Sequence, residues 1–350
     1  MELEFSTDQE ELRDSIRAVL TKESPVSVAR AVVEQNTAPT ALWATMTELG
    51  WPALTVPEEY GGIGLGMLEA GILAEELGRV IAPGPLLPTV TQFVPVVREC
   101  GSPEQQARFL GAVAAGECRG TVAIAEHAGS FDPADVTATG DKYYVIEGDA
   151  VDEIAVVRPD AVLIVPAASA RIERHHTIDG SRHLALVHLD GVGVDDDRTL
   201  RGPGIARALE HATLGLALEM VGTAQAIFDV TLEYAKQREQ FGVPIGSFQA
   251  IKHKFTDMMI ALERARSTAY FAALTIAEDD PRRATATSVA KAAVGDCQRL
   301  LAKEGIQIHG GIGYTWEHDM HLYVKRMKSG EVLFGSSQYH RARIAELLGV

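Results

Sequence analysis

The chain has 350 residues, of which 46% are hydrophobic, so it is long and apolar enough for roughly two or three domains with sizeable cores. Its 32 lysines and arginines against 48 aspartates and glutamates give a formal net charge of −16. This balance excludes an extended surface for nucleic acid or anionic membrane, because phosphate binding needs a local excess of cations. The N-terminus is acidic where a signal peptide would be basic, and no run approaches the ~18 apolar residues that span a bilayer. We therefore expect a cytoplasmic protein without membrane segments.

The first third of the chain, residues 1–119, is expected to be a helical domain. Thr7 and Glu10 have the spacing of a capping box and predict the start of the first helix. Gly78 is expected to cap the C-terminus of a later one. Three prolines within residues 83–88 argue against a helix there. The further helices are expected at residues 41–49, 68–78 and 103–115.

The middle of the chain, residues 120–203, is expected to be a small β domain. Short runs rich in β-branched and aromatic residues alternate here with Gly, Asp and Pro clusters. No amphipathic helix separates them, which favours an antiparallel barrel or sandwich over a parallel sheet. The expected strands are residues 121–125, 143–147, 161–165 and 184–189.

The remainder, residues 204–350, is expected to be a four-helix-type bundle. Long helical patterns cover residues 206–238, 248–278 and 284–309, and bundles of this kind commonly build oligomer interfaces. The fold class is therefore α+β, with helical domains on both sides of a β domain.

Three motifs are too particular to be scaffolding when they are taken together. The first motif contains Arg238, Phe241, Phe248 and Gln249, and the second contains Gln307, Gly310 and Gly311. The third motif begins at Gly335 and contains Ser336 and Gln338. Each alone has a simpler interpretation: an arginine near a helix C-terminus, a glycine C-cap and a serine N-cap.

In this order and spacing, the three motifs resemble those of the acyl-CoA dehydrogenase family. Residues 50–64 (GWPALTVPEEYGGIG), 75–79 (EELGR) and 125–130 (AEHAGS) extend the resemblance over nearly the whole chain. The resemblance implies a flavoenzyme that removes an α-proton and a β-hydride from an acyl-CoA thioester. FAD would accept the hydride, and an electron-transfer protein would reoxidise it.

The family's catalytic carboxylate is missing from both positions where the resemblance places it. Those positions are Ala212 and Phe334, and neither can accept a proton, so we expect no catalytic residue in this chain. Glu210 is turned about 200° around the helix from Ala212, which makes it a poor substitute. Glu219 lies ~10.5 Å further along nearly the same face, and Glu331 precedes Phe334 by three residues. A solvated or capping role competes with a catalytic role for each glutamate.

The resemblance also fails where the family walls the flavin ring. The β domain opens with Ala125, Glu126 and His127 where the family typically has a threonine before the glutamate. The positions matching the wall are Asp152, Glu153 and Ile154, and acidic groups there would repel a reduced, anionic flavin. We therefore expect this subunit to lack the residues that pack against the flavin ring.

The retained motifs match groups that reach the adenosine-pyrophosphate end of a neighbouring subunit's FAD. An arginine suits a pyrophosphate, and adjacent glycines allow close approach of the backbone. We therefore hypothesise an α2β2 heterotetramer whose homologous partner supplies the base, the flavin wall and the acyl pocket. Such enzymes serve lipid degradation, including steroid and cholesterol catabolism, and a vacated cavity here would admit a fused-ring acyl group. The expected cofactor-binding residues are Arg238, Phe241, Phe248, Gln249, Gln307, Gly310, Gly311, Ser336 and Gln338.

Two other hypotheses remain open. The chain is either a non-catalytic acyl-CoA-binding or assembly subunit without flavin contacts, or a homo-oligomeric enzyme whose base is Glu219. Tyr314, Thr315 and Trp316 line the cofactor region or serve packing.

No metal site is expected. The three cysteines are far apart and form no CxxC motif. His175, His176 and His183 are interpreted as surface residues, because no carboxylate or cysteine completes a ligand set with them.

Overall fold

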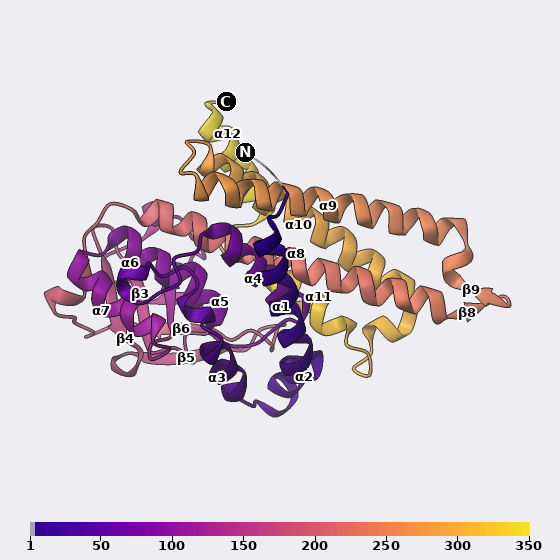
Figure 1. The fold of residues 1–350 in the computed structure, drawn as a ribbon, viewed down its shortest axis with the longest axis horizontal. Coiled ribbons are helices and arrows are strands. Elements are labelled where there is room, and N and C mark those ends of the chain that lie inside the picture. The colour runs from indigo at the N-terminus through magenta and orange to yellow at the C-terminus, as the bar shows by residue number, and fades with distance from the viewer. Residues whose placement is uncertain (1–3) are drawn as a thin grey trace.

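Helices at both ends of the chain flank two small β-sheets in the computed structural model, which describes residues 4–350 (Figure 1). This arrangement confirms the α+β class and the order helical, β, helical. The N-terminal helices and the sheets form one half of the molecule in Figure 1, and the long helices form the other.

The N-terminal helices form largely where expected, with two corrections. The capping box of α1 uses Ser6 and Gln9, one residue before the predicted pair, because the Ser6 hydroxyl accepts from the Gln9 backbone N–H. A helix also begins at Leu86, inside the proline-rich segment, since Pro88 lies in its first turn, where no N–H partner is required. The helices are α1 (Thr7–Glu23), α2 (Val26–Gln35), α3 (Thr40–Glu48), α4 (Met67–Arg79), α5 (Leu86–Pro88), α6 (Val94–Cys100) and α7 (Pro103–Ala114), with a π-helical turn, Thr89–Phe93, between α5 and α6.

Gly78 does not cap α4 but marks its crossing with α8 (Ile205–Gln237). A Cβ atom on Gly78 would lie 1.9 Å from the carbonyl oxygen of Glu219, and one on Gly222 would lie 1.8 Å from that of Glu75. Both positions therefore exclude a side chain, because the two helix backbones touch there.

The β domain is a two-sheet sandwich. One sheet has the order β1-β3-β4-β7 and the other β2-β6-β5. Every pair is antiparallel except β1 and β3, which run parallel because the chain crosses through the second sheet between them. Alternate residues such as Val145, Ile154 and Val187 fill the space between the sheets. The strands are β1 (Gly120–Ala123), β2 (Lys142–Ile146), β3 (Glu153–Val157), β4 (Val162–Pro166), β5 (Arg171–His175), β6 (Leu184–His188) and β7 (Thr199–Leu200).

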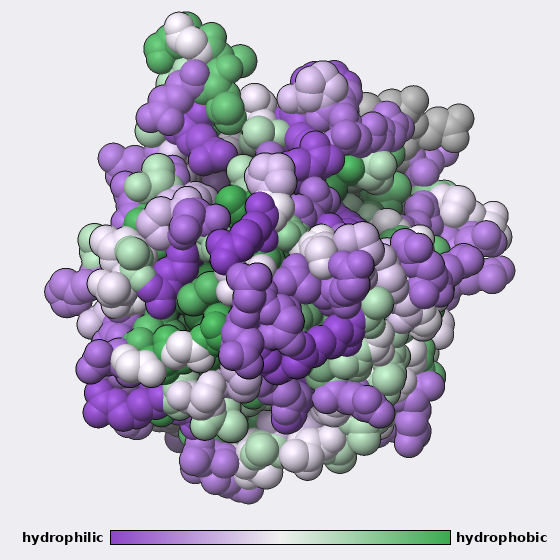
Figure 2. Space-filling view, turned by 90° about the vertical axis from the view of Figure 1, so that its left-hand side faces the viewer, coloured by the Kyte–Doolittle hydropathy of each residue, from purple (hydrophilic) through white to green (hydrophobic). Residues whose placement is uncertain are grey.

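The C-terminal helices pack around α8. By length and composition α8 is apolar enough to cross a membrane, but the rest of the chain buries 83% of its most apolar window. The hairpin of β8 and β9 projects from one end of the bundle (Figure 1), and an apolar tip of α12 stands above the body in Figure 2. The other elements are β8 (Glu239–Gln240), β9 (Val243–Pro244), α9 (Gln249–Ala277), α10 (Arg283–His309), α11 (Met320–Val332) and α12 (Ser337–Leu348).

Candidate functional site

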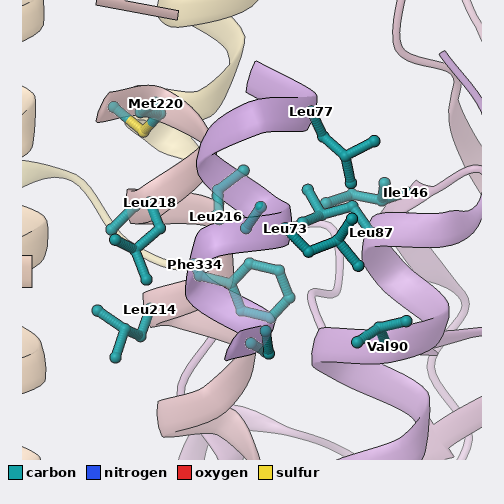
Figure 3. Packing of buried hydrophobic residues seen from close by; sticks show 14 of the residues in the cluster. Leu73, Leu77, Leu87, Val90, Ile146, Leu214, Leu216, Leu218, Met220 and Phe334 are labelled. Atoms are coloured by element: carbon teal, nitrogen blue, oxygen red, sulfur yellow. The ribbon is translucent and has the colours of Figure 1, made fainter. Parts of the chain in front are cut away.

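Phe334 occupies the expected base position and fills it with an apolar ring. The residue lies in the turn between α11 and α12, has a left-handed backbone (φ 53°) and is 4% exposed. Its ring centroid is 5.0 Å from that of Phe131, in the loop after β1. Figure 3 shows the Phe334 ring amid leucines of α4 and α8, including Leu73 and Leu214. The side chain at this expected base position is therefore part of the core packing.

The cavity beside Phe334 holds about 50 Å³. Pockets for drug-sized ligands hold about 300–1,000 Å³, so neither an isoalloxazine ring nor a fused-ring acyl group fits here. The structure therefore shows no enlarged cavity beside Phe334, because Phe131 and Phe334 take up the space. The lining includes Phe131, Pro133, Leu209, Glu210, Thr213, Thr287, Phe334, Tyr339, His340 and Arg343.

Buried polar groups hold the Phe334 turn in place. The ammonium of Lys291 donates to the carbonyl oxygens of Gly330, Glu331 and Gly335 at 3.1, 3.0 and 2.8 Å. Burial lowers the pKa of Lys291 to about 7. The His340 Nε2 atom lies 2.9 Å from the carbonyl oxygen of Phe334 and donates to it. The turn is thus clamped on both sides of the phenylalanine.

The clamp extends to the β domain. The Tyr339 hydroxyl lies 3.1 Å from a carboxylate oxygen of Asp132, in the loop that also carries Phe131. Sequence reasoning missed Phe131 and Tyr339, although Phe131 directly follows the 125–130 motif and Tyr339 directly follows the third motif.

Glu210, and not Ala212, faces the Phe334 cavity. The cavity-lining residues of α8 are Ala206, Leu209, Glu210 and Thr213, whereas Ala212 is 1% exposed within the hydrophobic core. The assignment of Glu210 to a face away from the site is therefore wrong. Desolvation raises the pKa of Glu210, but its carboxylate is already ion-paired with Arg283.

Glu219 is a buried, doubly paired carboxylate, so neither the solvated nor the capping role is correct for it. Its two oxygens contact the guanidinium groups of Arg182 and Arg326, the latter at 3.0 Å, and all three side chains are under 5% exposed. Desolvation raises the pKa of Glu219, but Arg182 and Arg326 outweigh it and hold the pKa below its usual value. A carboxylate held in this way is a weak base.

Glu331 has the capping role that its position allowed. One of its carboxylate oxygens accepts from the backbone N–H of Ser337 at 3.3 Å and from the Ser337 hydroxyl at 3.2 Å. It therefore holds the start of α12 and does not face the Phe334 cavity.

The three expected flavin-wall positions do not reach the Phe334 cavity. Asp152 pairs with Arg119 at 2.8 Å, Glu153 pairs with Arg198 at 2.8 Å, and Ile154 lies fully buried in the sandwich. The two acidic side chains therefore form ion pairs within the β domain. The loop containing Phe131 and Pro133 borders the cavity instead.

The opening of the β domain is also occupied by structural contacts. Ala125 is fully buried. Glu126 pairs at 2.7 Å with Lys142, whose side chain is completely buried. His127 lies beside Tyr143 on a surface cleft. None of the three borders the Phe334 cavity.

Most of the expected cofactor-binding residues gather at the hairpin end of the bundle. Tyr234 of α8 stacks on His309 of α10, with ring centroids 4.4 Å apart. Arg238 follows Tyr234 by one helical turn, and Gly310 directly follows His309, so the first two motifs flank this stack. The exposed members are Arg238, Phe241, Phe248, Gln249, Gln307, Gly310 and Gly311.

These end residues are free to contact another molecule. Within residues 4–350, Arg238 has no ion-pair partner. A Cβ atom on Gly310 or Gly311 would meet no atom of the chain within 4 Å. Gly310 needs its glycine for the backbone (φ 64°), but Gly311 has no such need.

Ser336 and Gln338 lie elsewhere. The Ser336 hydroxyl accepts from the Tyr339 backbone N–H and caps α12, which packs against Gly295 through Ser337. Gly295 precedes Gly310 by fifteen residues, or about 22 Å along α10. The structure thus divides the expected cofactor residues into two separate sets.

The two halves of FAD fit this chain differently. The cavity at Phe334 is too small for the isoalloxazine. At the hairpin end, the unpaired guanidinium of Arg238 and the two glycines with open space flank the Tyr234–His309 stack, and their chemistry fits a pyrophosphate and a closely approaching nucleotide.

His183 is not an isolated surface residue, so the reason given for dismissing it as a ligand is wrong. Ligand atoms of Glu147, Asp149 and His183 lie within 4.8 Å of one another. Arg174 contacts both Asp149, at 3.1 Å, and His183, and supplies the cluster's positive charge. We therefore assign no metal to it.

Comparison with known proteins gives consistent matches along the chain. Residues 6–117 match the family model "Acyl-CoA dehydrogenase, N-terminal domain", and residues 203–349 match "Acyl-CoA dehydrogenase, C-terminal domain". The chain is 32% identical over 341 residues to the acyl-CoA dehydrogenase IpdE2 of Mycobacterium tuberculosis, covering 94% of this chain and 93% of the relative.

Two solved structures are also similar. One is a chain of the ChsE4–ChsE5 complex from Mycobacterium tuberculosis, with a TM-score of 0.91 and 26% identity over 100% of this chain and 99% of that one. The other is a variant of the steroid acyl-CoA dehydrogenase Tcur3481–Tcur3483, with a TM-score of 0.86 and 27% identity over 98% of each chain.

Proposed function

The chain belongs to the acyl-CoA dehydrogenase family, and from this premise we propose that it is the base-less subunit of an FAD-dependent α2β2 enzyme. A homologous partner subunit supplies the catalytic carboxylate, the flavin wall and the acyl pocket. The observation that carries the proposal is the contrast between two sites. The cavity at Phe334 is small, whereas Arg238, Gly310 and Gly311 at the hairpin end are exposed and free to contact another molecule.

In this proposal the chain's own residues bind and position but do not transfer protons. Arg238 donates to the pyrophosphate of the partner's FAD, and the backbone at Gly310 and Gly311 approaches the adenosine. Gln249 and Gln307 supply amide hydrogen bonds, and Phe241 and Phe248 supply apolar contact. FAD supplies the hydride acceptor when bound, and an electron-transfer protein reoxidises it.

The proposed substrate is a bulky, steroid side-chain-like acyl-CoA, desaturated at the α,β position. Support comes from similarity to a steroid acyl-CoA dehydrogenase and to a complex of two differently named subunits. Because the cavity beside Phe334 is too small for this substrate, the proposal places the acyl group in the partner subunit. We propose a cytoplasmic location for the complex.

Ser336 and Gln338 have a smaller part in the proposal. Ser336 already caps α12, which leaves its hydroxyl less free for a cofactor. This observation favours the alternative function, an acyl-CoA-binding or assembly subunit without flavin contacts.

Flavin content of the complex tests the proposal. The chain is produced alone and together with a homologous acyl-CoA dehydrogenase subunit that carries the catalytic carboxylate, and visible absorbance is measured. We expect flavin only in the complex, and we expect the double variant Arg238→Ala/Gln307→Ala to lose more than half of it. Lys236→Ala/Lys303→Ala is the matched control, since both lysines are exposed on the same two helices.

Two results contradict the proposal. Stoichiometric flavin on the isolated chain would favour a homo-oligomeric enzyme. Full flavin in the complex of the Arg238→Ala/Gln307→Ala variant would favour the assembly subunit.

A further inference from the structure

A cleft between the N-terminal helices and the β domain is separate from both sites described above. Its volume is about 540 Å³, which is within the range of pockets for small ligands. Its walls come from the α2–α3 loop, the start of α3, the segment before α5, the β2–β3 turn and β5 (Figure 1). None of the described residues that line the Phe334 cavity, and none of the expected cofactor-binding residues, lines this cleft. We call it the interdomain cleft, and its lining includes Trp43, Pro85, Glu147, Asp149, Arg174 and His183.

Glu147 brings a buried carboxylate to this cleft, and no arginine or lysine of residues 4–350 pairs with it. The side chain borders the cleft although the residue is only 3% exposed. One of its oxygens accepts from the backbone N–H of His183 at 3.1 Å, and the other lies 3.9 Å from the His183 Nδ1 atom, beyond hydrogen-bond distance. Arg182 and Arg326 bind Glu219 instead. Burial therefore raises the pKa of Glu147.

The backbone of Glu147 is also held in a conformation that favours glycine. Its φ of 54° is in the left-handed region, which is uncommon for a glutamate. The turn maintains this conformation, because the Glu147 N–H donates to the His183 carbonyl and the Ala150 N–H donates to the Glu147 carbonyl, both at 2.8 Å. Backbone strain and an unpaired buried carboxylate thus coincide at one residue, and this combination is typical of ligand sites.

The other charged groups that line the cleft are already paired. Arg174 of β5 binds Asp149 at 3.1 Å, and Arg119, directly before β1, binds Asp152 at 2.8 Å. These pairs compensate each other's charge, so the excess charge of the cleft is the carboxylate of Glu147. The cleft is therefore complementary to a cation.

The rest of the cleft fits an organic cation with an apolar body. A carboxylate oxygen of Glu147 and one of Asp149 lie within 4.8 Å of each other, so one ammonium group with three donors can reach both. Trp43, Pro39 and Pro85 add aromatic and apolar walls. An aromatic ring attracts a cation as well as apolar surface, which suits a ligand that carries both.

The same carboxylates are less suited to a divalent metal ion. The third possible ligand would be His183, but the guanidinium of Arg174 contacts both His183 and Asp149. Repulsion from this guanidinium acts on two charges for a divalent ion and on one for an ammonium group. The charge of the cleft therefore favours a singly charged ligand.

We propose that the interdomain cleft binds a small organic molecule with a primary ammonium group, which pairs with Glu147 while the apolar part of the molecule lies against Trp43. Such a ligand contacts the N-terminal helical domain and the β domain at the same time. The cleft shares no residue with the FAD contact of the proposed function, so each can fail without the other.

The test measures the binding of phenethylamine to the chain by titration calorimetry, with phenethyl alcohol as its neutral isostere. We expect a dissociation constant of about 1 mM or below for the amine, and one at least about tenfold higher for the alcohol, because only the ammonium group pairs with a carboxylate.

Glu147→Gln should weaken binding of the amine at least about tenfold. It should not lower the unfolding temperature of the free chain, because glutamine still accepts from the His183 N–H and removes an unpaired buried charge. Glu173→Gln is the matched control, since Glu173 is exposed on β5 and does not line the cleft. This control should bind the amine as the wild-type chain does.

Four results would overturn the proposal. The first is no binding of phenethylamine to the wild-type chain, and the second is equal binding of the amine and the alcohol, which would show an apolar cleft only. The third is binding of Zn²⁺ alone that Glu147→Gln abolishes, in a chain that ignores the amine, which would show a metal site. The fourth is a Glu147→Gln chain that binds the amine as the control does, or that unfolds well below it, which would give Glu147 a structural role.

Discussion

Glu219 shows how the surroundings of one residue decide its chemistry. The carboxylate lies on α8, seven residues beyond the expected base position at Ala212. Arg182 and Arg326 bind both of its oxygens and lower its pKa, although burial alone would raise it. A catalytic base needs the reverse balance, so Glu219 stabilises the fold.

Glu219→Gln should lower the free energy of unfolding at pH 7 by about 3–5 kcal/mol, because two buried guanidinium groups lose their counterion. The folded pKa lies below the unfolded value of about 4.3, so this stabilisation is complete above that pH and is lost as the pH falls through the folded pKa. Urea unfolding at pH 7 and at pH 3 should therefore show a smaller difference between variant and wild type in acid.

Glu331→Gln is the control for Glu219→Gln, because it makes the same substitution at a glutamate that pairs with no arginine. Its carboxylate only caps α12, so a loss of about 1 kcal/mol is expected. A Glu219→Gln deficit that stays constant from pH 7 to pH 3 would show that the charge of Glu219 is not what stabilises the protein.

At the scale of elements, the crossing of α4 and α8 depends on two glycines. Gly78 and Gly222 let the backbones touch, which brings the Glu75–Glu76 end of α4 against α8. Gly222 lies inside a helix, where alanine would ordinarily be favoured by about 1 kcal/mol. Contact with α4 must therefore outweigh helix propensity.

Gly222→Ala should destabilise the protein by more than about 2 kcal/mol despite the better helix former, because a Cβ atom cannot be placed 1.8 Å from a carbonyl oxygen. Gly311→Ala should change the free energy of unfolding by less than about 0.5 kcal/mol, since nothing surrounds that position. Denaturant unfolding of both variants measures the contrast. A stabilised Gly222→Ala protein would mean that the helices do not cross there.

The helices that periodicity and caps predict are the long amphipathic ones, such as α8, α9 and α10. The elements missing from the sequence-based prediction are short or atypical, such as α2, β5 and the helix that begins within the proline-rich segment. Their patterns are too brief to separate from loops, and packing against the rest of the chain decides their conformation.

At the scale of the molecule, Arg326 joins the three parts of the chain. Its guanidinium contacts Glu219 of α8 at 3.0 Å, the backbone carbonyl of Ser181 near the β domain at 2.8 Å, and that of Ile81 after α4 at 3.3 Å. One buried side chain from α11 thus links segments as far apart as 245 residues. Cooperative unfolding of the whole chain is the expected consequence.

Arg326→Met should therefore separate the unfolding of the parts. Calorimetry of the wild-type chain should give one transition, and the variant should give a broadened or divided one at lower temperature, because about 3–5 kcal/mol of linking interactions is removed. Lys328→Met, two residues along α11 and exposed, should behave as wild type. A single sharp transition in the Arg326→Met variant would show that other contacts couple the parts.

The sequence by itself determined the family, the order helical, β, helical, and the absence of a carboxylate at Ala212 and Phe334. Those features depend on residue identity and on spacing along the chain, which motifs preserve. Only the tertiary structure decided that the cavity at Phe334 is small, that two arginines bind the carboxylate of Glu219, and that the expected cofactor-binding residues divide into two sets. Each of these depends on contacts between distant segments, as in the pairs Phe131–Phe334 and Arg182–Glu219, and no local pattern encodes the burial and charge that such contacts create.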